Sequence, residues 1–275
     1  TPTISRKKHI IKPITCHYGS GKPAVAIIGS LHGDEPVGKK IIDALSTLKI
    51  IKGTLTTIIA HPYALCRKKR FIEEDLNRSF PGNLKGKLEE KIAYNIMKEV
   101  KKTNYLIDIH SSTTDIQDAI IIKHQNKKIR KMLDIMKPRR AILMPKGIGD
   151  GSLINFFPQA LSLEYGRHNS RRTYCRSLND IKRMLRFFRM IKCKRLEKKK
   201  YKSNYYRVYD IEKKPKGFIM KRSLRNFKLV KRGELLGVIK NKEVFSQEDF
   251  YPVLFGPKSY PDIMGFKAKR LKRMI

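Results

Sequence analysis

The sequence predicts an α/β fold, in which a sheet carries helices on its faces and a small β domain follows. At 275 residues and 40% hydrophobic content, the chain can bury a full core in one large domain or two unequal ones. Short apolar runs alternate with helical or loop segments, a pattern typical of α/β sheets. The expected strands cover residues 24–28, 55–60, 105–109, 119–122, 141–144 and 160–163.

Three expected helices have apolar residues at helical spacing. Pro36 precedes apolar side chains within 41–48, which predicts a helix with proline in its first turn. A second helix is predicted over residues 88–100 and a third over 178–191. The third lies in the stretch 167–202, which has 15 Lys and Arg against two acids. We expect this basic amphipathic helix to close the first domain.

A domain boundary is expected near residue 200. Beyond it, short β-type runs at 205–209, 217–220 and 235–239 are separated by glycines and polar turns. We therefore expect a first domain over residues 1–200 and a small β domain over residues 201–275.

The net charge of +38 is a strong bias toward anionic partners. Such a field steers small carboxylates, and it equally attracts nucleic-acid phosphates through counterion release. A lysine-rich proteome or a high-salt cytoplasm would give the same bias without any such function. No RNA-binding motif of the RRM or KH type is present, and the aromatic residues fall at core-like spacings. Nonspecific nucleic-acid binding through the basic surface stays open.

The chain is expected to be soluble and cytoplasmic, with no membrane association. Its start lacks the apolar core of a signal peptide, and no apolar run approaches the roughly 20 residues that span a bilayer. The cysteines have no CxxC spacing and fit reduced thiols better than a disulfide framework or a zinc knuckle; they are Cys16, Cys66, Cys175 and Cys193.

His32 and Glu35 lie three residues apart in the expected loop between a buried strand and a helix. Ligands bind beyond the carboxyl ends of strands in open α/β sheets, and zinc takes imidazole nitrogen and carboxylate oxygen. His110, at the end of another apolar segment, is the candidate third ligand, although His61 and His124 also follow or end apolar runs. A surface loop with a helix cap and an ordinary strand-end histidine is the alternative.

The segment 70–82 supplies the second observation, because it carries the sequence DLNRSFPG in a long loop after an apolar strand. Together with HGDE at 32–35, IDIHSS at 107–112 and Leu163–Gly166, it resembles the succinylglutamate desuccinylase and aspartoacylase family of zinc amidohydrolases, which is related to the zinc carboxypeptidases. The order and spacing match along most of the chain. The resemblance implies a zinc-carboxypeptidase-like mixed sheet flanked by helices, and a C-terminal β domain that covers the site.

The resemblance also implies roles for individual residues. One zinc ion per chain would be held by His32, Glu35 and His110, with Glu164 as the general base. Arg70 would help to polarise the scissile carbonyl. The substrate carboxylates would be bound by Asn77 and Arg78, and Tyr260, downstream of Tyr251-Pro252-Val253, would be the active-site tyrosine.

The chemistry of these residue types supports the roles. Zinc lowers the pKa of bound water to about 7, so amide hydrolysis needs only a base to move the proton to the leaving nitrogen. Glu164 follows an apolar run, where a carboxylate costs desolvation energy unless a cation compensates; pairing with Arg167 is its structural alternative. Arg70 and Arg78 can meet an oxyanion or grip a carboxylate, and the alternative for each is a solvated charge.

One departure from the family affects the substrate. In aspartoacylases, an arginine about ten residues before the catalytic glutamate grips the substrate carboxylate, but this chain has Ile154 there. Arg167 or a basic residue of the later helix could substitute. The predicted function is zinc-dependent hydrolysis of the amide bond of a small anionic N-acyl amino acid. The alternatives are a metallocarboxypeptidase acting on peptide C-termini and a basic nucleic-acid-associated protein on a hydrolase fold.

Overall fold

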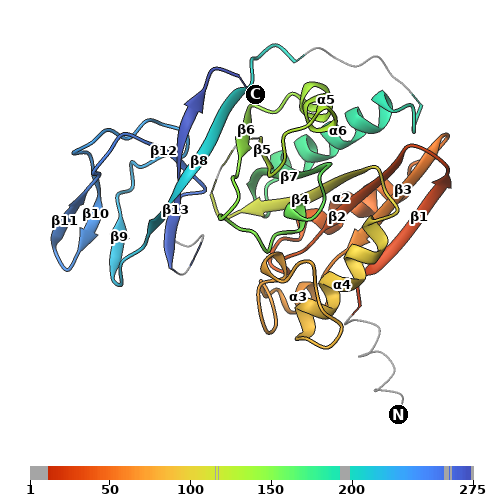
Figure 1. Ribbon diagram of the computed structural model, residues 1–275, viewed down its shortest axis with the longest axis horizontal. Helices are drawn as coiled ribbons and strands as arrows, with labels where there is room; N and C mark the ends of the chain where they lie inside the picture. Colours follow the sequence, from red (N-terminus) through yellow and green to blue (C-terminus); the bar gives the residue numbers. More distant parts are fainter. Residues whose placement is uncertain are drawn as a thin grey trace.

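The computed structural model describes residues 12–114, 116, 118–192, 199–256, 260 and 262–273. Most of its described strands form one mixed sheet (Figure 1). From edge to edge the order is β1 (Ile14–Ser20), β3 (Gly53–Ile59), β2 (Ala24–Gly29), β4 (Tyr105–Ser112), β7 (Ala160–Arg167), β5 (Ala119–Ile122), β6 (Arg140–Leu143), β8 (Asn204–Lys213), β13 (Ile263–Leu271) and β12 (Tyr251–Val253). The prediction of an α/β fold with a mixed sheet is confirmed.

The centre of the sheet explains the continuous apolar runs in the sequence. Strands β3, β2, β4 and β7 are parallel neighbours, and every residue of β2 is buried. Parallel strands covered on both faces read as unbroken apolar sequence, as residues 24–28 do. The antiparallel pairing of β1 with β3 and of β5 with β7 makes the sheet mixed.

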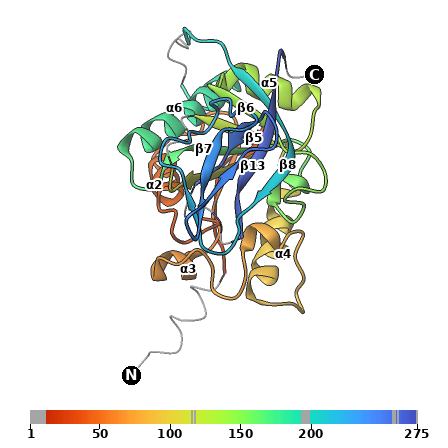
Figure 2. The same ribbon diagram turned by 90° about the vertical axis from the view of Figure 1, so that its left-hand side faces the viewer.

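Helices cover both faces of this sheet. One core cluster joins Val25 and Ile27 of β2 to the helices α2 (Val37–Ser46), α5 (Lys127–Met136) and α6 (Arg171–Phe187). The other joins Ala26 and Ile28 to α4 (Leu88–Val100). Figure 2 shows α2 and α6 on one side of the strands and α4 on the other. Alternate residues of one strand therefore reach two different cores.

Residues beyond 200 contribute to two sheets. Strand β8 pairs in parallel with β6, starting at Asn204 opposite Arg140, and then pairs with β13. The remaining strands form a three-stranded sheet in the order β11 (Lys242–Phe245), β10 (Leu235–Ile239) and β9 (Phe218–Met220). A small C-terminal sheet is thus present, and in Figure 1 the long strands β8 and β13 lie between it and the body of the protein.

Several elements have no counterpart in the sequence prediction. These are β1, β11, β12, β13, α5, the short helix α3 (Pro62–Arg67) and the 3-10 turns η1 (Leu76–Arg78) and η2 (Leu153–Asn155). The third expected helix also begins earlier than residue 178, because Ser170 caps α6 by accepting a hydrogen bond from the Thr173 N–H, and it ends at Phe187. None of the described helices is long and apolar enough to cross a membrane.

Candidate active site

Three parallel strands deliver the central side chains to one edge of the sheet. His32 follows β2, His110 lies near the end of β4, and Glu164 lies in β7 directly opposite His110 in the strand register. Because parallel strands end at the same edge, residues far apart in the sequence meet there. The turn after β2 is tight: a Cβ on Gly33 would lie 2.1 Å from the carbonyl carbon of Ala64 in α3.

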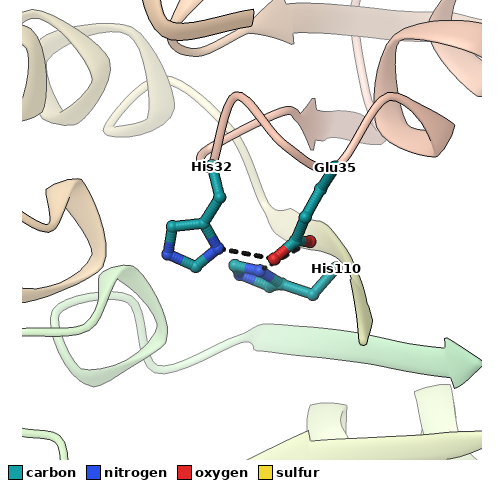
Figure 3. A group of neighbouring side chains, drawn as sticks. All are labelled: His32, Glu35 and His110. Carbon is teal, nitrogen blue, oxygen red and sulfur yellow. Dashed lines mark hydrogen bonds and ion pairs between the residues drawn. The ribbon is translucent and has the colours of Figure 1, made fainter. Parts of the chain in front are cut away.

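His32, Glu35 and His110 form a buried group that could hold a metal ion (Figure 3). The Nδ1 atom of His32 lies 2.7 Å from one carboxylate oxygen of Glu35, and Nδ1 of His110 lies 3.4 Å from the other. One potential ligand atom from each residue lies within 4.8 Å of the others. Two imidazoles and one carboxylate are a donor set used by catalytic zinc sites. The residues fit a metal ion of this kind.

Two further carboxylates fix the far nitrogens of the imidazoles. Nε2 of His32 lies 3.1 Å from Oδ1 of Asp75, and Nε2 of His110 lies 2.7 Å from Oδ2 of Asp108. A proton on each Nε2 would satisfy these contacts and leave each Nδ1 as the nitrogen that can bind a metal ion beside Glu35. Glu35 is itself fixed by the Ser111 N–H, which donates to Oε2 over 2.7 Å.

The sequence analysis did not assign roles to Asp75 and Asp108, although the position of each in the sequence indicates one. Asp108 lies two residues before His110 on one strand, so the two side chains share a face. Asp75 opens the DLNR motif and caps η1 by accepting from the Asn77 N–H. The other histidines are engaged elsewhere: Nε2 of His61 meets Glu89, and Nε2 of His124 meets the Asn155 carbonyl. The geometry therefore singles out His110.

Glu164 lines the same cavity as the metal-ligand group. Its Oε2 atom is buried and has no hydrogen-bond partner within the described residues. Burial raises the pKa of Glu164 to about 8; the charge of His110 opposes this shift and those of Glu35 and Asp108 add to it. No ion pair joins Glu164 to Arg167 in the part of the chain that the structure describes, and Arg167 is exposed. The carboxylate is thus open to a ligand in the cavity.

Two arginines and an amide lie beside this carboxylate. Arg70 donates from Nε and Nη2 to Oδ2 of Asp75, over 3.1 and 2.9 Å, and its Nη1 lies 3.9 Å from Glu35. Arg78 is exposed, and its Nη1 donates to the Asn77 carbonyl. Asn77 accepts from the Leu153 N–H through Oδ1, and its Nδ2 lies 3.4 Å from Nε2 of His110.

Tyr260 reaches the cavity from the C-terminal part of the chain, with its ring edge-on to Phe266. Burial raises the pKa of its hydroxyl, and the nearby Glu164 adds to the shift. The cavity is lined by all of the predicted site residues, namely His32, Glu35, Arg70, Asn77, Arg78, His110, Glu164 and Tyr260. Ile154 also lines it, as do Lys123 and His168, which the sequence analysis did not name.

A buried glutamate anchors the loop that carries Arg70 and Asp75. Glu89 in α4 is fully buried and accepts hydrogen bonds from the backbone N–H groups of residues 72–74 over 2.8 to 3.3 Å. Its Oε1 also lies 3.1 Å from Nε2 of His61. Burial opposes ionisation, but the Ile72 N–H and His61 outweigh it and lower the pKa of Glu89. The loop is therefore tied to the helix by one charged side chain.

Comparison with known proteins identifies a family. The family model for the succinylglutamate desuccinylase/aspartoacylase catalytic domain matches residues 21–186. A probable aspartoacylase of Acaryochloris marina is 31% identical over 111 residues, 36% of this chain and 38% of that protein. An N-acyl-aromatic-L-amino acid amidohydrolase (carboxylate-forming) of Xenopus laevis is 27% identical over 113 residues, 36% of this chain and 37% of that protein. The matches thus span less than two fifths of these curated relatives.

The fold extends the likeness beyond the matched sequence. The crystal structure of murine aminoacylase 3 superposes with a TM-score of 0.71 at 17% identity, covering 92% of this chain and 97% of that one. At 92% of the chain, its coverage extends beyond residues 21–186, which the family model matches. Since the family model matches more than half of the sequence, the chain belongs to the succinylglutamate desuccinylase/aspartoacylase family.

Proposed function

We propose that the protein is a zinc-dependent deacylase that hydrolyses the amide bond of a small anionic N-acyl amino acid, with one zinc ion per chain. The observation that carries the proposal is the single cavity in which the His32, Glu35 and His110 group lies beside the unpartnered carboxylate of Glu164. Family membership and the amidohydrolase relative support it. A cytoplasmic location belongs to the same proposal, in keeping with the unpaired Cys16, Cys66 and Cys175.

The zinc would be held by Nδ1 of His32, Nδ1 of His110 and the Glu35 carboxylate. When bound, zinc lowers the pKa of water to about 7 and polarises a carbonyl. Asp75 and Asp108 keep the two imidazoles in the tautomer that presents Nδ1. Their hydrogen bonds also raise the basicity of the two imidazoles as ligands. A buried group of this kind needs such fixed partners, because a free imidazole would rotate away from the carboxylate.

Glu164 acts as the general base and then as the general acid. It takes one proton from the attacking water and gives it to the nitrogen of the breaking C–N bond, which leaves as the amine. The acyl group leaves as a carboxylic acid, which then ionises to the carboxylate. Burial raises the pKa of Glu164 to about 8 in the absence of a metal, and the positive charge of zinc bound in the same cavity would lower that pKa and favour the ionised form that a general base needs. Burial is the main cause of that shift, so the surrounding cavity sets the chemistry.

The cations position the substrate and stabilise charge. Arg70, held by Asp75, lies near Glu35 and can meet the oxyanion that develops on the scissile carbonyl. Arg78 and Asn77 bind the substrate carboxylate, with the guanidinium offering a two-pronged contact. Tyr260, which lines the same cavity, contributes a hydroxyl donor.

We further propose that residues 201–275 act as a unit that covers the site, while residues 1–200 carry the metal group. Tyr260 and Phe266 come from this later part and line the cavity. A wall formed this way favours small acylated amino acids over long peptides, which distinguishes the proposal from a metallocarboxypeptidase. A peptide of five or more residues should therefore be a poor substrate.

A second candidate activity is nonspecific nucleic-acid binding. The net charge is +38, and a groove between α5 and α6 is lined by Lys127, Arg130, Lys131 and Arg183 beside Phe187. The groove also contains one acid, Asp134, so its four basic side chains leave it positively charged. Basic side chains next to an exposed aromatic ring suit a phosphate backbone. Binding to random RNA that falls steeply between 50 and 300 mM salt would support this activity; binding that does not change with salt would contradict it.

Metal analysis of the purified protein, combined with an amine-release assay, tests the proposed deacylase. N-acetyl and N-succinyl amino acids are assayed with and without a chelator. We expect stoichiometric zinc and release that the chelator abolishes and added zinc restores. Zinc-free protein that releases no amine after zinc is supplied would overturn the proposal.

A further inference from the structure

Part of the cavity wall is apolar. We call it the apolar end, and it is formed by the lining residues Ile121, Met144, Ile148, Ile154, Leu254 and Phe266. Each is at most 8% exposed, and all belong to the core cluster that also contains α4. They come from β5, the residue after β6, the following loop, η2 and the C-terminal strands. Apolar surface inside a cavity favours an apolar ligand group over water.

The cations that line the cavity are unequally available to a substrate. Arg70 already makes a two-pronged contact with Asp75. Arg78, by contrast, donates to the Asn77 carbonyl, and no ion pair with a carboxylate involves it among the described residues. Arg78 can therefore accept a substrate carboxylate without breaking an existing ion pair.

Lys123 is the other lysine or arginine that lines the cavity, and it is fully engaged. Its side chain is 2% exposed, and its Nζ donates to the carbonyls of Pro145 and Ile148 over 3.0 and 2.6 Å and to Asp150 over 2.9 Å. An ammonium group has three donors, so none is left over. Lys123 braces the loop that carries Ile148, and Asp150 balances its charge.

His168 lies on the polar side of the cavity, where its Nδ1 is 2.8 Å from the Ser111 hydroxyl. It follows β7, in which Ser162, six residues earlier, lies opposite Ile121 of the apolar end. A second carboxylate placed at the apolar end would thus be buried among hydrocarbon side chains, with no free cation from the described residues to meet it. Burying an unpaired charge in this way is costly.

We propose that the substrate carries a single carboxylate, bound by Arg78, and an apolar group that occupies the apolar end. The enzyme then prefers singly charged N-acyl amino acids over dicarboxylates. This inference rests on the proposed deacylase function and names its substrate class. The apolar group can be either the amino-acid side chain or the acyl chain, since either of these can be a hydrocarbon chain.

Matched ligand pairs measured by calorimetry on zinc-loaded Glu164→Gln test the proposal, because that variant should bind substrate without turning it over. N-acetylnorleucine against N-acetylglutamate probes the side chain, and N-hexanoylglycine against N-succinylglycine probes the acyl chain. We expect the apolar member to bind at least about tenfold more tightly in one pair, and that pair identifies the group. Equal or tighter binding of the dicarboxylate in both pairs would overturn the proposal.

Three cavity variants sharpen the result. Ile154→Arg should shift the preference toward the dicarboxylates, whereas Ile154→Leu, its matched control, should keep the apolar preference. Lys123→Met removes the brace on the loop that carries Ile148, but it should not create a preference for dicarboxylates, since that lysine is not a substrate ligand. If the unmodified cavity prefers a dicarboxylate and Lys123→Met removes that preference, Lys123 is the receptor and the proposal is wrong.

The failure of this inference is distinguishable from failure of the proposed function. Amine release by the unmodified, zinc-loaded protein tests hydrolysis, and the affinity ratio within a ligand pair tests the apolar end. Amine release together with tighter binding of the dicarboxylates contradicts only this inference. Selective binding of the apolar ligands without any amine release contradicts only the proposed hydrolase function. Absence of binding by all four ligands contradicts both.

Discussion

Nε2 of His32 lies 3.1 Å from Oδ1 of Asp75, and the other oxygen of the same carboxylate receives the Arg70 guanidinium. One side chain thus links a proposed zinc ligand to the proposed oxyanion cation. The pKa of Asp75 is strongly lowered, because the hydrogen bond from His32 and the charges of His32 and Arg70 outweigh the effect of burial. The carboxylate stays ionised, so it can orient both groups at once.

Substitution Asp75→Ala should therefore weaken zinc affinity about 10- to 100-fold, because His32 loses the partner that fixes its tautomer. It should also lower turnover at saturating zinc, since Arg70 loses its anchor. Zinc affinity is measured by competition with a chelating dye. Asp43→Ala is the control, because Asp43 is exposed and pairs with Lys39 on the surface of α2. Unchanged zinc affinity in Asp75→Ala would rule out the orienting role.

The proposed site was largely predictable from the sequence because its residues follow apolar strands. His32, Glu35, His110 and Glu164 stand at or near strand ends, and the sheet brings them together. Glu89 was not predictable: an acid in the first turn of a helix is common, and its burial depends on a loop that folds back over α4. The pairing of β8 with β6 was also not predictable, since the spacing of apolar residues indicates where strands lie but not which strands pair.

Substitution Glu89→Gln should destabilise the protein and loosen the loop that carries Arg70. The buried carboxylate accepts three backbone hydrogen bonds, and a neutral amide accepts them more weakly, so we expect a loss of about 1–3 kcal/mol in the free energy of unfolding. Denaturant titration measures it, with exposed Glu243→Gln as the control. Equal stability of the two variants would show that Glu89 does not hold the loop.

An ion-pair network between β13 and β8 predicts a pH dependence of stability. Nζ of Lys267 lies 3.0 Å from Asp210, 3.2 Å from Glu212 and 2.9 Å from Glu248. Its hydrogen bonds lower the pKa values of Asp210 and Glu248. The folded protein then binds protons at these sites more weakly than the unfolded chain, so the stabilisation is present above about pH 4 and is lost as the pH falls through the folded values.

The variant Lys267→Met should accordingly lose roughly 1 kcal/mol in the free energy of unfolding at neutral pH, a small value because these carboxylates are largely exposed. The difference from the unmodified protein should shrink as the pH falls below about 4, where the carboxylates are protonated. Denaturant titrations between pH 3 and pH 7 measure it, with Lys272→Met as the control. A difference that stays constant over this range would contradict an electrostatic origin.

The central claim, that a metal group and a separate carboxylate base act together, is tested most directly by zinc content and amine release measured on Glu164→Gln. His110→Ala, measured beside it, should lose zinc itself. We predict that Glu164→Gln keeps stoichiometric zinc while amine release falls by about 10²- to 10⁴-fold, the usual contribution of a general base. Full activity in Glu164→Gln would contradict the mechanism.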